Sequence, residues 1–173
     1  ECAKKEPWFE NTIFVFVNDH PNQTYYERYK EPITNMGAAI MFYSPNPNLV
    51  PTQHYSEIAQ QIDIYPSLVD LMGYDKPFRS WGRSVFSKEA DETPRAFISN
   101  AIMYQMMQGN YLYILDENGK VNGIYKKEDR AMKNNLLGKE DNPEIQKGIQ
   151  DLKAFVQDYM NRIIHHKLDP NNN

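Results

Sequence analysis

The sequence predicts an α/β fold, on the strength of three features spaced along the chain. Residues 12–17 form an uninterrupted apolar run, residues 95–125 hold four strand-like segments separated by turns, and residues 145–163 carry a helical apolar stripe. An apolar run without polar alternation is typical of a strand buried on both faces, as in parallel sheets. We therefore expect a sheet with flanking helices, then a small antiparallel sheet covered by a long carboxy-terminal helix.

The first residues predict a short helix that leads into the buried strand. Residues 1–6 have a helix-forming composition, no capping residue precedes them, and Pro7-Trp8 ends the helix after little more than one turn. We interpret this segment as the tail of a longer helix that begins before residue 1. After the strand at 12–17, Pro21 marks where the chain has left it.

A second apolar segment at residues 38–43 predicts another strand, and the segment 44–48, rich in Pro and Asn, predicts a turn after it. Between the two strands lies a segment rich in tyrosine and charge, residues 24–31. Its aromatic rings could contact a lipid or sugar head group, or the segment could be an ordinary solvent-facing loop. Both interpretations remain open at this point.

A short helix is predicted after the second strand. Asp63 and Pro66 indicate its start, and Gly73 indicates its end. We interpret Asp63 as a carboxylate that caps the first turn, in preference to a metal ligand. Spacings of three and four residues predict the face that packs on the sheet, formed by Leu68, Leu71 and Met72.

Four short strands should form the antiparallel sheet, at residues 95–99, 103–107, 111–115 and 121–125. Asn118-Gly119 predicts a hairpin because both residues tolerate positive φ. The methionines of this region fill irregular core space more often than they bind a ligand, so we expect core positions for Met103, Met106 and Met107.

The carboxy-terminal helix has the clearest pattern. Asn142 precedes Pro143, a favoured first helical residue. A stripe follows that should lie across the antiparallel sheet: Ile145, Ile149, Leu152, Val156, Tyr159 and Ile163. His165 and His166 stand at the end of this helix, where imidazolium complements the helix dipole. We favour this over a metal role because no third ligand is near them in sequence.

Asp19 and His20 directly follow the first predicted strand. Functional groups in α/β sheets gather at the carboxyl ends of strands. A carboxylate oxygen and an imidazole nitrogen suit zinc, manganese or iron. Two ligands do not complete a metal site, and loop polarity or a capping Asp is the alternative interpretation of such a pair.

Three further polar residues are candidates for function. Arg79 and Arg83 flank Trp81-Gly82, where guanidinium groups could bind phosphate or sulfate in bidentate fashion. They could equally clamp the loop to neighbouring carboxylates, which we favour. His54 is a weaker candidate for a metal ligand.

Composition excludes several classes of function. The chain has 173 residues and a formal net charge of -4, with acids and bases interspersed. This pattern gives no basic surface for nucleic acid or for an anionic membrane. The one cysteine, Cys2, excludes an internal disulfide, and we see no apolar run near the length that crosses a bilayer.

Several segments in order along the chain resemble a known family. They are Asp19-His20, residues 38–45, 59–66, 73–77 and 81–82, the segment 108–112 and the segment 133–138. Together they resemble the C-terminal part of a sulfatase or lipoteichoic-acid-synthase-like protein of the alkaline phosphatase superfamily, found in membrane-anchored bacterial proteins. The resemblance covers essentially the whole chain.

The resemblance implies where the catalytic groups lie. Asp19 and His20 match two ligands of the family's catalytic divalent metal, which could be manganese, zinc, calcium or magnesium. The family's nucleophile, a Thr or a modified Cys or Ser, and a further acidic ligand lie upstream of this pair. We therefore expect a fragment with no catalytic nucleophile, in which residues 1–90 are part of the sulfatase-like α/β core and residues 91–173 are a subdomain of antiparallel sheet and helix.

The resemblance also implies a function and a location. The substrate would be a phosphate or sulfate ester, possibly lipid-linked or on a glycan, and the reaction hydrolysis or phosphoglycerol transfer. The location would be the extracytoplasmic side of a bacterial inner membrane. The alternative is a non-catalytic envelope binding protein, kept open by Asn18, where relatives often carry a smaller residue. An apolar face exposed by truncation would favour self-association.

Overall fold

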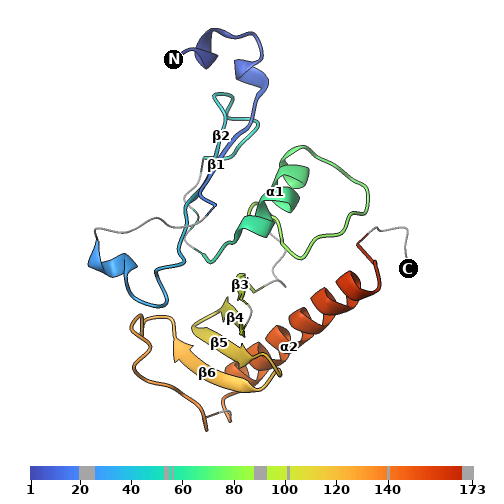
Figure 1. Cartoon of the computed structure of the whole chain (residues 1–173). Coiled ribbons are helices and arrows are strands. Elements are labelled where there is room, and N and C mark those ends of the chain that lie inside the picture. Colours follow the sequence, from blue (N-terminus) through green and yellow to red (C-terminus); the bar gives the residue numbers. More distant parts are fainter. Residues whose placement is uncertain are drawn as a thin grey trace.

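The computed structural model describes residues 1–19, 26–52, 55, 57–87, 93–100, 102–139 and 141–168. The strands are β1 (Phe14–Val17), β2 (Ile40–Tyr43), β3 (Arg95–Ser99), β4 (Met103–Gln108), β5 (Tyr111–Asp116) and β6 (Val121–Lys126). The helices are α1 (Ile64–Leu71) and α2 (Pro143–Ile164), and short 3-10 turns lie at Ala3–Lys5, Phe9–Asn11, Glu27–Tyr29 and Gln61–Asp63 (Figure 1). The helix predicted at residues 1–6 is thus a single 3-10 turn.

β1 and β2 form a two-stranded antiparallel ribbon. Phe14 pairs with Tyr43 and Phe16 pairs with Met41, so these four side chains share one face. That face is open, because Phe16 is 52% exposed and Met41 is 53% exposed. The expectation of a strand buried on both faces of a parallel sheet is therefore wrong for the described residues: β1 has one antiparallel partner and only one covered face.

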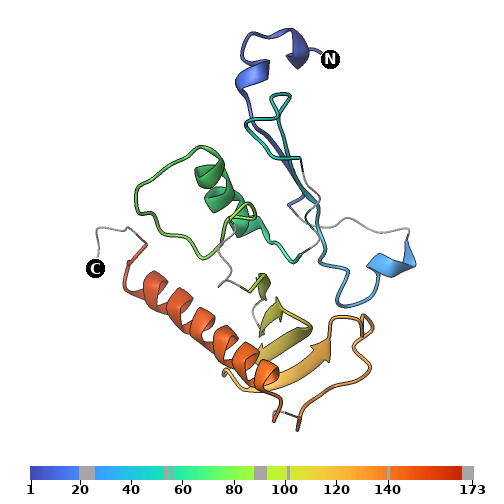
Figure 2. The same ribbon diagram turned by 180° about the vertical axis from the view of Figure 1, so that it is seen from behind.

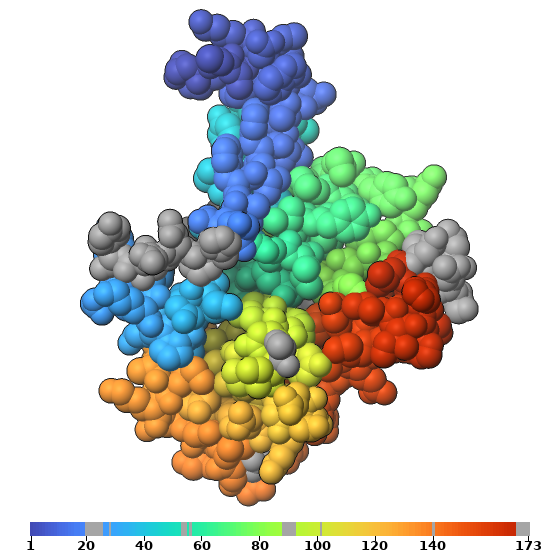
Figure 3. All heavy atoms as spheres, in the orientation of Figure 1, coloured from blue at the N-terminus to red at the C-terminus, as the bar shows by residue number. Residues whose placement is uncertain are grey.

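The covered face of the ribbon packs on the segment around α1. The Phe42 ring lies edge-on to the Phe86 ring, with centroids 5.2 Å apart. The amino-terminal segment and the ribbon stand out from the rest of the molecule in Figure 3. The accessible surface of the chain is 12291 Å², whereas a compact monomer of 20.3 kDa exposes roughly 8,800 Å².

Helix α1 ends as predicted, and its predicted buried face is only partly correct. Gly73 has a φ of +67°, the left-handed conformation that ends a helix without strain. Met72 is 67% exposed, so it does not pack the helix on a sheet. The residues buried in α1 are Pro66, Ser67 and Val69. The predicted face is confirmed in part, since Leu68 and Leu71 are half-buried. The periodicity missed Ser67, which is buried for its hydrogen bonds and not for apolarity.

The small antiparallel sheet is confirmed, with strand order β3-β4-β5-β6. Its core includes Met106, Tyr113 and Leu115, each 1% exposed or less. The turn between β5 and β6 differs in detail from the prediction, since Gly119 has a φ of +77° while Asn118 stays at negative φ. The Asp116 carboxylate stabilises the turn without a second positive φ. It accepts hydrogen bonds from the Asn118 and Lys120 amides, both at 2.9 Å.

Helix α2 covers the sheet along β4 and β5, as Figure 2 shows from behind. The Asn142 side chain caps it by accepting the Glu144 amide at 2.9 Å. The stripe is confirmed at Ile145 and Leu152, but Ile163 is 42% exposed. The sequence pattern missed two buried positions of this helix, Gly148 and Phe155.

A tryptophan joins the α1 region to α2. The Trp81 indole nitrogen donates to the Asp158 carboxylate at 2.9 Å, and its ring lies 5.1 Å from the Tyr159 ring. The Arg162 guanidinium lies over the same indole, 5.6 Å from its centroid. The predicted division of the chain near residue 90 falls on residues 88–92, outside the described residues, and stays a prediction.

Gly148 allows a close approach between α2 and the sheet. A Cβ there would lie 2.0 Å from Cζ of Tyr113, whose side chain is fully enclosed. We expect Gly148→Ala to lower the free energy of unfolding by about 1–3 kcal/mol, because overpacking outweighs the better helix propensity of alanine. Urea unfolding measures this. The exposed helical control Asn161→Ala should stay within about 0.5 kcal/mol, and a Gly148→Ala protein as stable as the original would contradict the packing.

The open ribbon face should make the isolated chain self-associate. The surface in excess of a compact monomer is larger than the roughly 1,600 Å² that a stable interface buries, and neither strand carries a charge that protects its edge. We expect light scattering to show a mass that rises with concentration, and Phe16→Glu to reduce it. Thr52→Glu, away from the ribbon face, is the control. A monodisperse monomer at every concentration would contradict this expectation.

Candidate metal centre at the end of strand β1

Asp19 lies two residues beyond the end of β1, on an exposed stretch of backbone. The Gln61 side-chain amide donates to the Asn18 carbonyl at 2.5 Å and to the Asp19 carbonyl at 3.0 Å. Gln61 thus holds the backbone at the point where the strand ends. The Asp19 residue itself is exposed, so a cation can reach it from solvent.

A pocket of about 280 Å³ adjoins Asp19. Most of its wall is apolar and comes from three parts of the chain: Met36 and Ile40 around β2, Ala59 and Ile62 before α1, and Ala96 and Ile98 of β3. The second sheet therefore contributes to the surroundings of the candidate ligand. Apolar walls with a few polar groups are typical of small-molecule sites.

The other predicted metal ligands cannot be placed. His20 and His54 lie outside the described residues, so the pairing of Asp19 with His20 stays a prediction. Within the described part of the chain, no group of three or more His, Cys, Asp or Glu could hold a metal ion. Asp19 fits as one oxygen ligand, and a complete centre needs ligands beyond those that the structure describes.

Asp63 has a structural role, as expected, but not the predicted one. Its side chain is 1% exposed and accepts hydrogen bonds from the amides of Gln60 and Arg83, each at 3.0 Å. Burial raises the pKa of this carboxyl, while the bonds from Arg83 and Gln60 oppose the rise. The prediction that it caps the first turn of α1 is wrong, because it satisfies the preceding 3-10 turn and the Arg83 loop instead.

The two arginines hold loops in place. The Arg79 side chain donates to the Lys167 carbonyl at 2.8 Å. The Arg83 guanidinium bonds the Tyr55 hydroxyl and the Ile58 carbonyl, and lies 3.9 Å from the Glu57 carboxylate. The clamp that we favoured is thus observed for Arg83 with a carboxylate, and for Arg79 with a backbone carbonyl.

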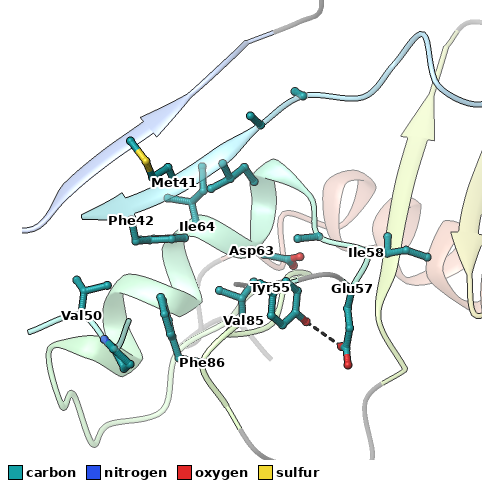
Figure 4. A pocket seen from close by; sticks show the side chains of 15 residues that line it. Met41, Phe42, Val50, Tyr55, Glu57, Ile58, Asp63, Ile64, Val85 and Phe86 are labelled. Carbon is teal, nitrogen blue, oxygen red and sulfur yellow. Dashed lines mark hydrogen bonds between the residues drawn. The ribbon is translucent and has the colours of Figure 1, made fainter. Parts of the chain in front are cut away.

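A larger pocket of about 580 Å³ lies between β2 and the start of α1 (Figure 4). Its walls are mainly apolar, with Phe42, Ile64 and Phe86 among them, and the Tyr55 hydroxyl donates to Glu57 at 3.0 Å at one end. Burial raises the pKa of Tyr55. Asp19 does not line this pocket, so it is separate from the candidate metal ligand.

Sequence reasoning missed the two residues that position the site, Gln60 and Gln61. The Gln60 side-chain oxygen accepts the Phe97 amide of β3 at 2.8 Å, while Gln61 holds the end of β1. The only signal was their place just before Asp63, where Gln60 precedes the 3-10 turn and Gln61 begins it. Glutamine has no strong positional preference at the start of a 3-10 turn, so the sequence pattern did not predict these two contacts.

Comparison with known proteins was informative only at the level of structure. No family model and no curated protein matches the sequence. Three solved structures align with 91–92% of the chain. One is a protein in the alkaline phosphatase superfamily from Vibrio parahaemolyticus, with a TM-score of 0.66 and 22% identity.

The other two are sulfatase structures. A candidate sulfatase from Bacteroides thetaiotaomicron has a TM-score of 0.54 and 19% identity, and a 2-O GAG sulfatase has a TM-score of 0.56 and 20% identity. The chain has an alkaline-phosphatase-like fold. It spans 38% of the length of each of these structures.

The alkaline-phosphatase-like fold confirms the fold that the sequence resemblance implied. None of the three structures is described as a lipoteichoic-acid-synthase-like protein, so that finer assignment stays a prediction. The described helices include none long and apolar enough to cross a membrane.

Removing the Asp63 carboxylate should destabilise the fold. Asp63→Ala leaves the buried amides of Gln60 and Arg83 without an acceptor, at about 1–3 kcal/mol for each unsatisfied group. We expect urea unfolding to show a loss of at least about 2 kcal/mol, and a smaller loss for Asp63→Asn, which keeps one acceptor oxygen. The exposed control Asp75→Ala should be neutral. An Asp63→Ala protein with unchanged stability would contradict the role of this carboxylate.

Proposed function

We propose that the chain supplies part of the metal centre of an enzyme that acts on phosphate or sulfate esters. The observation that carries this proposal is the exposed Asp19 at the end of β1, beside a pocket and within an alkaline-phosphatase-like fold. His20, the next residue, would be the second ligand. The sulfatases among the structural neighbours support a sulfate ester as the substrate, and a phosphate ester uses the same chemistry.

Each part of this chain has a defined task under the proposal. A divalent ion, when bound, would polarise an ester oxygen and neutralise developing negative charge. The Asp19 carboxylate would hold that ion, and Gln61 would fix the backbone that carries the carboxylate. The apolar wall of the adjoining pocket would exclude water from one side of the ester. A nucleophile would come from a segment that precedes residue 1.

The acceptor determines the reaction class. Water as acceptor gives hydrolysis, and a glycerol or glycan hydroxyl gives transfer. We further propose that the parent protein is a bacterial inner-membrane protein with this part on the extracytoplasmic side, as the sequence resemblance implies.

The alternative of a non-catalytic binding protein rests on Asn18. Its side chain is exposed and does not line the pocket beside Asp19. Asn18 therefore does not crowd the proposed site, which makes the enzyme the better supported proposal.

The isolated chain should bind a divalent ion weakly and should turn over no ester. Calorimetric titration with Mn²⁺ or Zn²⁺ should give an affinity weaker than micromolar, because at most two of the family's ligands are present. Asp19→Ala or His20→Ala should weaken it by roughly tenfold or more, about 1.4 kcal/mol. Asp75→Ala, another exposed carboxylate, is the matched control and should bind as the original chain does.

Two results would contradict this proposal. Metal binding that is unchanged by both Asp19→Ala and His20→Ala would remove these residues from the centre. Ester turnover by the isolated chain would show that the nucleophile lies within it.

A further inference from the structure

A second hollow lies next to the pocket beside Asp19. This second hollow is an open groove of about 730 Å³, between the segment that follows Glu31 and the loop that follows β6. Ile58 and Met107 line its apolar part. Figure 1 shows the blue segment before β2 lying next to the orange loop after β6, and the Ile33 amide donates to the Arg130 carbonyl at 3.2 Å.

Three pairs of residues that are close in the chain or across strands connect the groove with the pocket. Thr34 lines the groove and Met36 lines the pocket. Ile58 lines the groove and Ala59 lines the pocket. Met107 of the groove is the direct cross-strand partner of Ala96 of the pocket. The two hollows therefore lie next to each other, because neighbouring residues of the same segments line one and then the other.

Hydrogen bonds within the loop after β6 define its backbone conformation beside the groove. The Asp129 carboxylate accepts the Lys133 amide at 3.1 Å and the Asn134 amide at 2.7 Å. The bond from Asn134, with that from Lys133, lowers the pKa of Asp129. Met132 is held at a φ of +53°, a left-handed conformation that is strained for methionine.

This loop presents three cations to the groove: Lys127, Arg130 and Lys133. None of the three forms an ion pair with another described residue. Asp129, which is used by the loop itself, and the carboxylates of Glu31 and Glu128 line the groove as well. Cationic side chains bind oxyanions, and carboxylates accept hydrogen bonds from hydroxyl groups. A saccharide that carries sulfate or phosphate offers both kinds of group.

We propose that this groove is a second subsite of the substrate, which binds a sulfate or phosphate group on a saccharide whose reacting ester lies at Asp19. The inference rests on the proposed ester chemistry at Asp19 and adds the substrate class, an oligosaccharide with more than one anionic group. The net charge of -4 gives the chain no general attraction for such a ligand, so binding depends on the local arrangement of the three cations.

The test measures binding and needs no metal. The chain is titrated calorimetrically, with a chelator present, with a heparin-derived tetrasaccharide and with the same tetrasaccharide after chemical desulfation. We expect binding of the sulfated form that weakens as salt is added. The triple variant Lys127→Gln, Arg130→Gln, Lys133→Gln should bind it at least about tenfold more weakly, because charge-assisted hydrogen bonds to the oxyanions are lost.

The matched control removes three charges elsewhere: Lys76→Gln, Lys120→Gln, Lys153→Gln, all at exposed positions outside the groove. It should keep the affinity of the original chain. Equal losses in the two triple variants, no binding of the sulfated form, or equal binding of the desulfated form would each overturn the proposal. Inorganic sulfate that binds as tightly as the tetrasaccharide would also overturn the proposal. The same holds if the groove binds anionic lipid vesicles more tightly than the tetrasaccharide.

The variant Asp19→Ala separates this proposal from the one on which it rests. Asp19 is outside the groove, so Asp19→Ala should bind the sulfated tetrasaccharide with unchanged affinity in chelator. Failure of metal binding at Asp19 with intact groove binding would refute the metal centre alone. Intact metal binding without groove binding would refute the subsite alone.

Discussion

The buried carboxylate of Asp63 is the interaction on which the arrangement of the site depends. It accepts the amides of Gln60 and Arg83, and so joins the 3-10 turn before α1 to the loop that follows Trp81. Ser67 extends the same junction, because its hydroxyl donates to the Asp63 carbonyl at 2.6 Å and accepts the Val85 amide at 3.0 Å. Gly82 allows the close contact, since a Cβ there would lie 2.1 Å from the Ile62 carbonyl oxygen. A buried acceptor with two fixed donors costs far more to remove than an exposed one, so this junction specifies one geometry.

The consequence reaches both sheets through two neighbouring glutamines. Once the turn is fixed, the Gln60 side chain meets the amide of Phe97 in β3, and the Gln61 side chain meets the carbonyls beyond β1. The same four-residue segment thus sets where the candidate metal ligand lies relative to the second sheet. This explains why β3 contributes to the pocket beside Asp19 although the two are almost eighty residues apart in sequence. The pocket beside Asp19 has walls from both sheets, so it requires this junction. Each sheet alone would leave the pocket open on one side.

Local patterns predicted the elements well and their environments less well. The stripe of α2, its cap at Asn142 and the four strands of the second sheet follow from periodicity and turn chemistry that act within a few residues. The burial of Ser67 in α1 did not follow, because its hydroxyl accepts a hydrogen bond from the Val85 amide, eighteen residues away. The open face of β1 did not follow either, since an apolar run states what a strand can bury and not what is present to cover it. For the site, the sequence indicated Asp19 but not Gln60 or Gln61, whose partners are distant in the chain.

The position of Asp19 reflects a balance between the two parts of the fold. The four-stranded sheet and α2 bury a continuous core that includes Met106, Tyr113 and Leu152, whereas β1 has one partner strand and one open face. A two-stranded ribbon is marginally stable by itself in water, so its end would move easily unless something else restrained it. Gln61 supplies that restraint from the turn fixed by Asp63, and the restraint acts on the backbone and leaves the Asp19 carboxylate exposed. The backbone at Asp19, the candidate metal ligand, is therefore held in place by the stable junction, and the residue is exposed because the strand before it is covered on one face only.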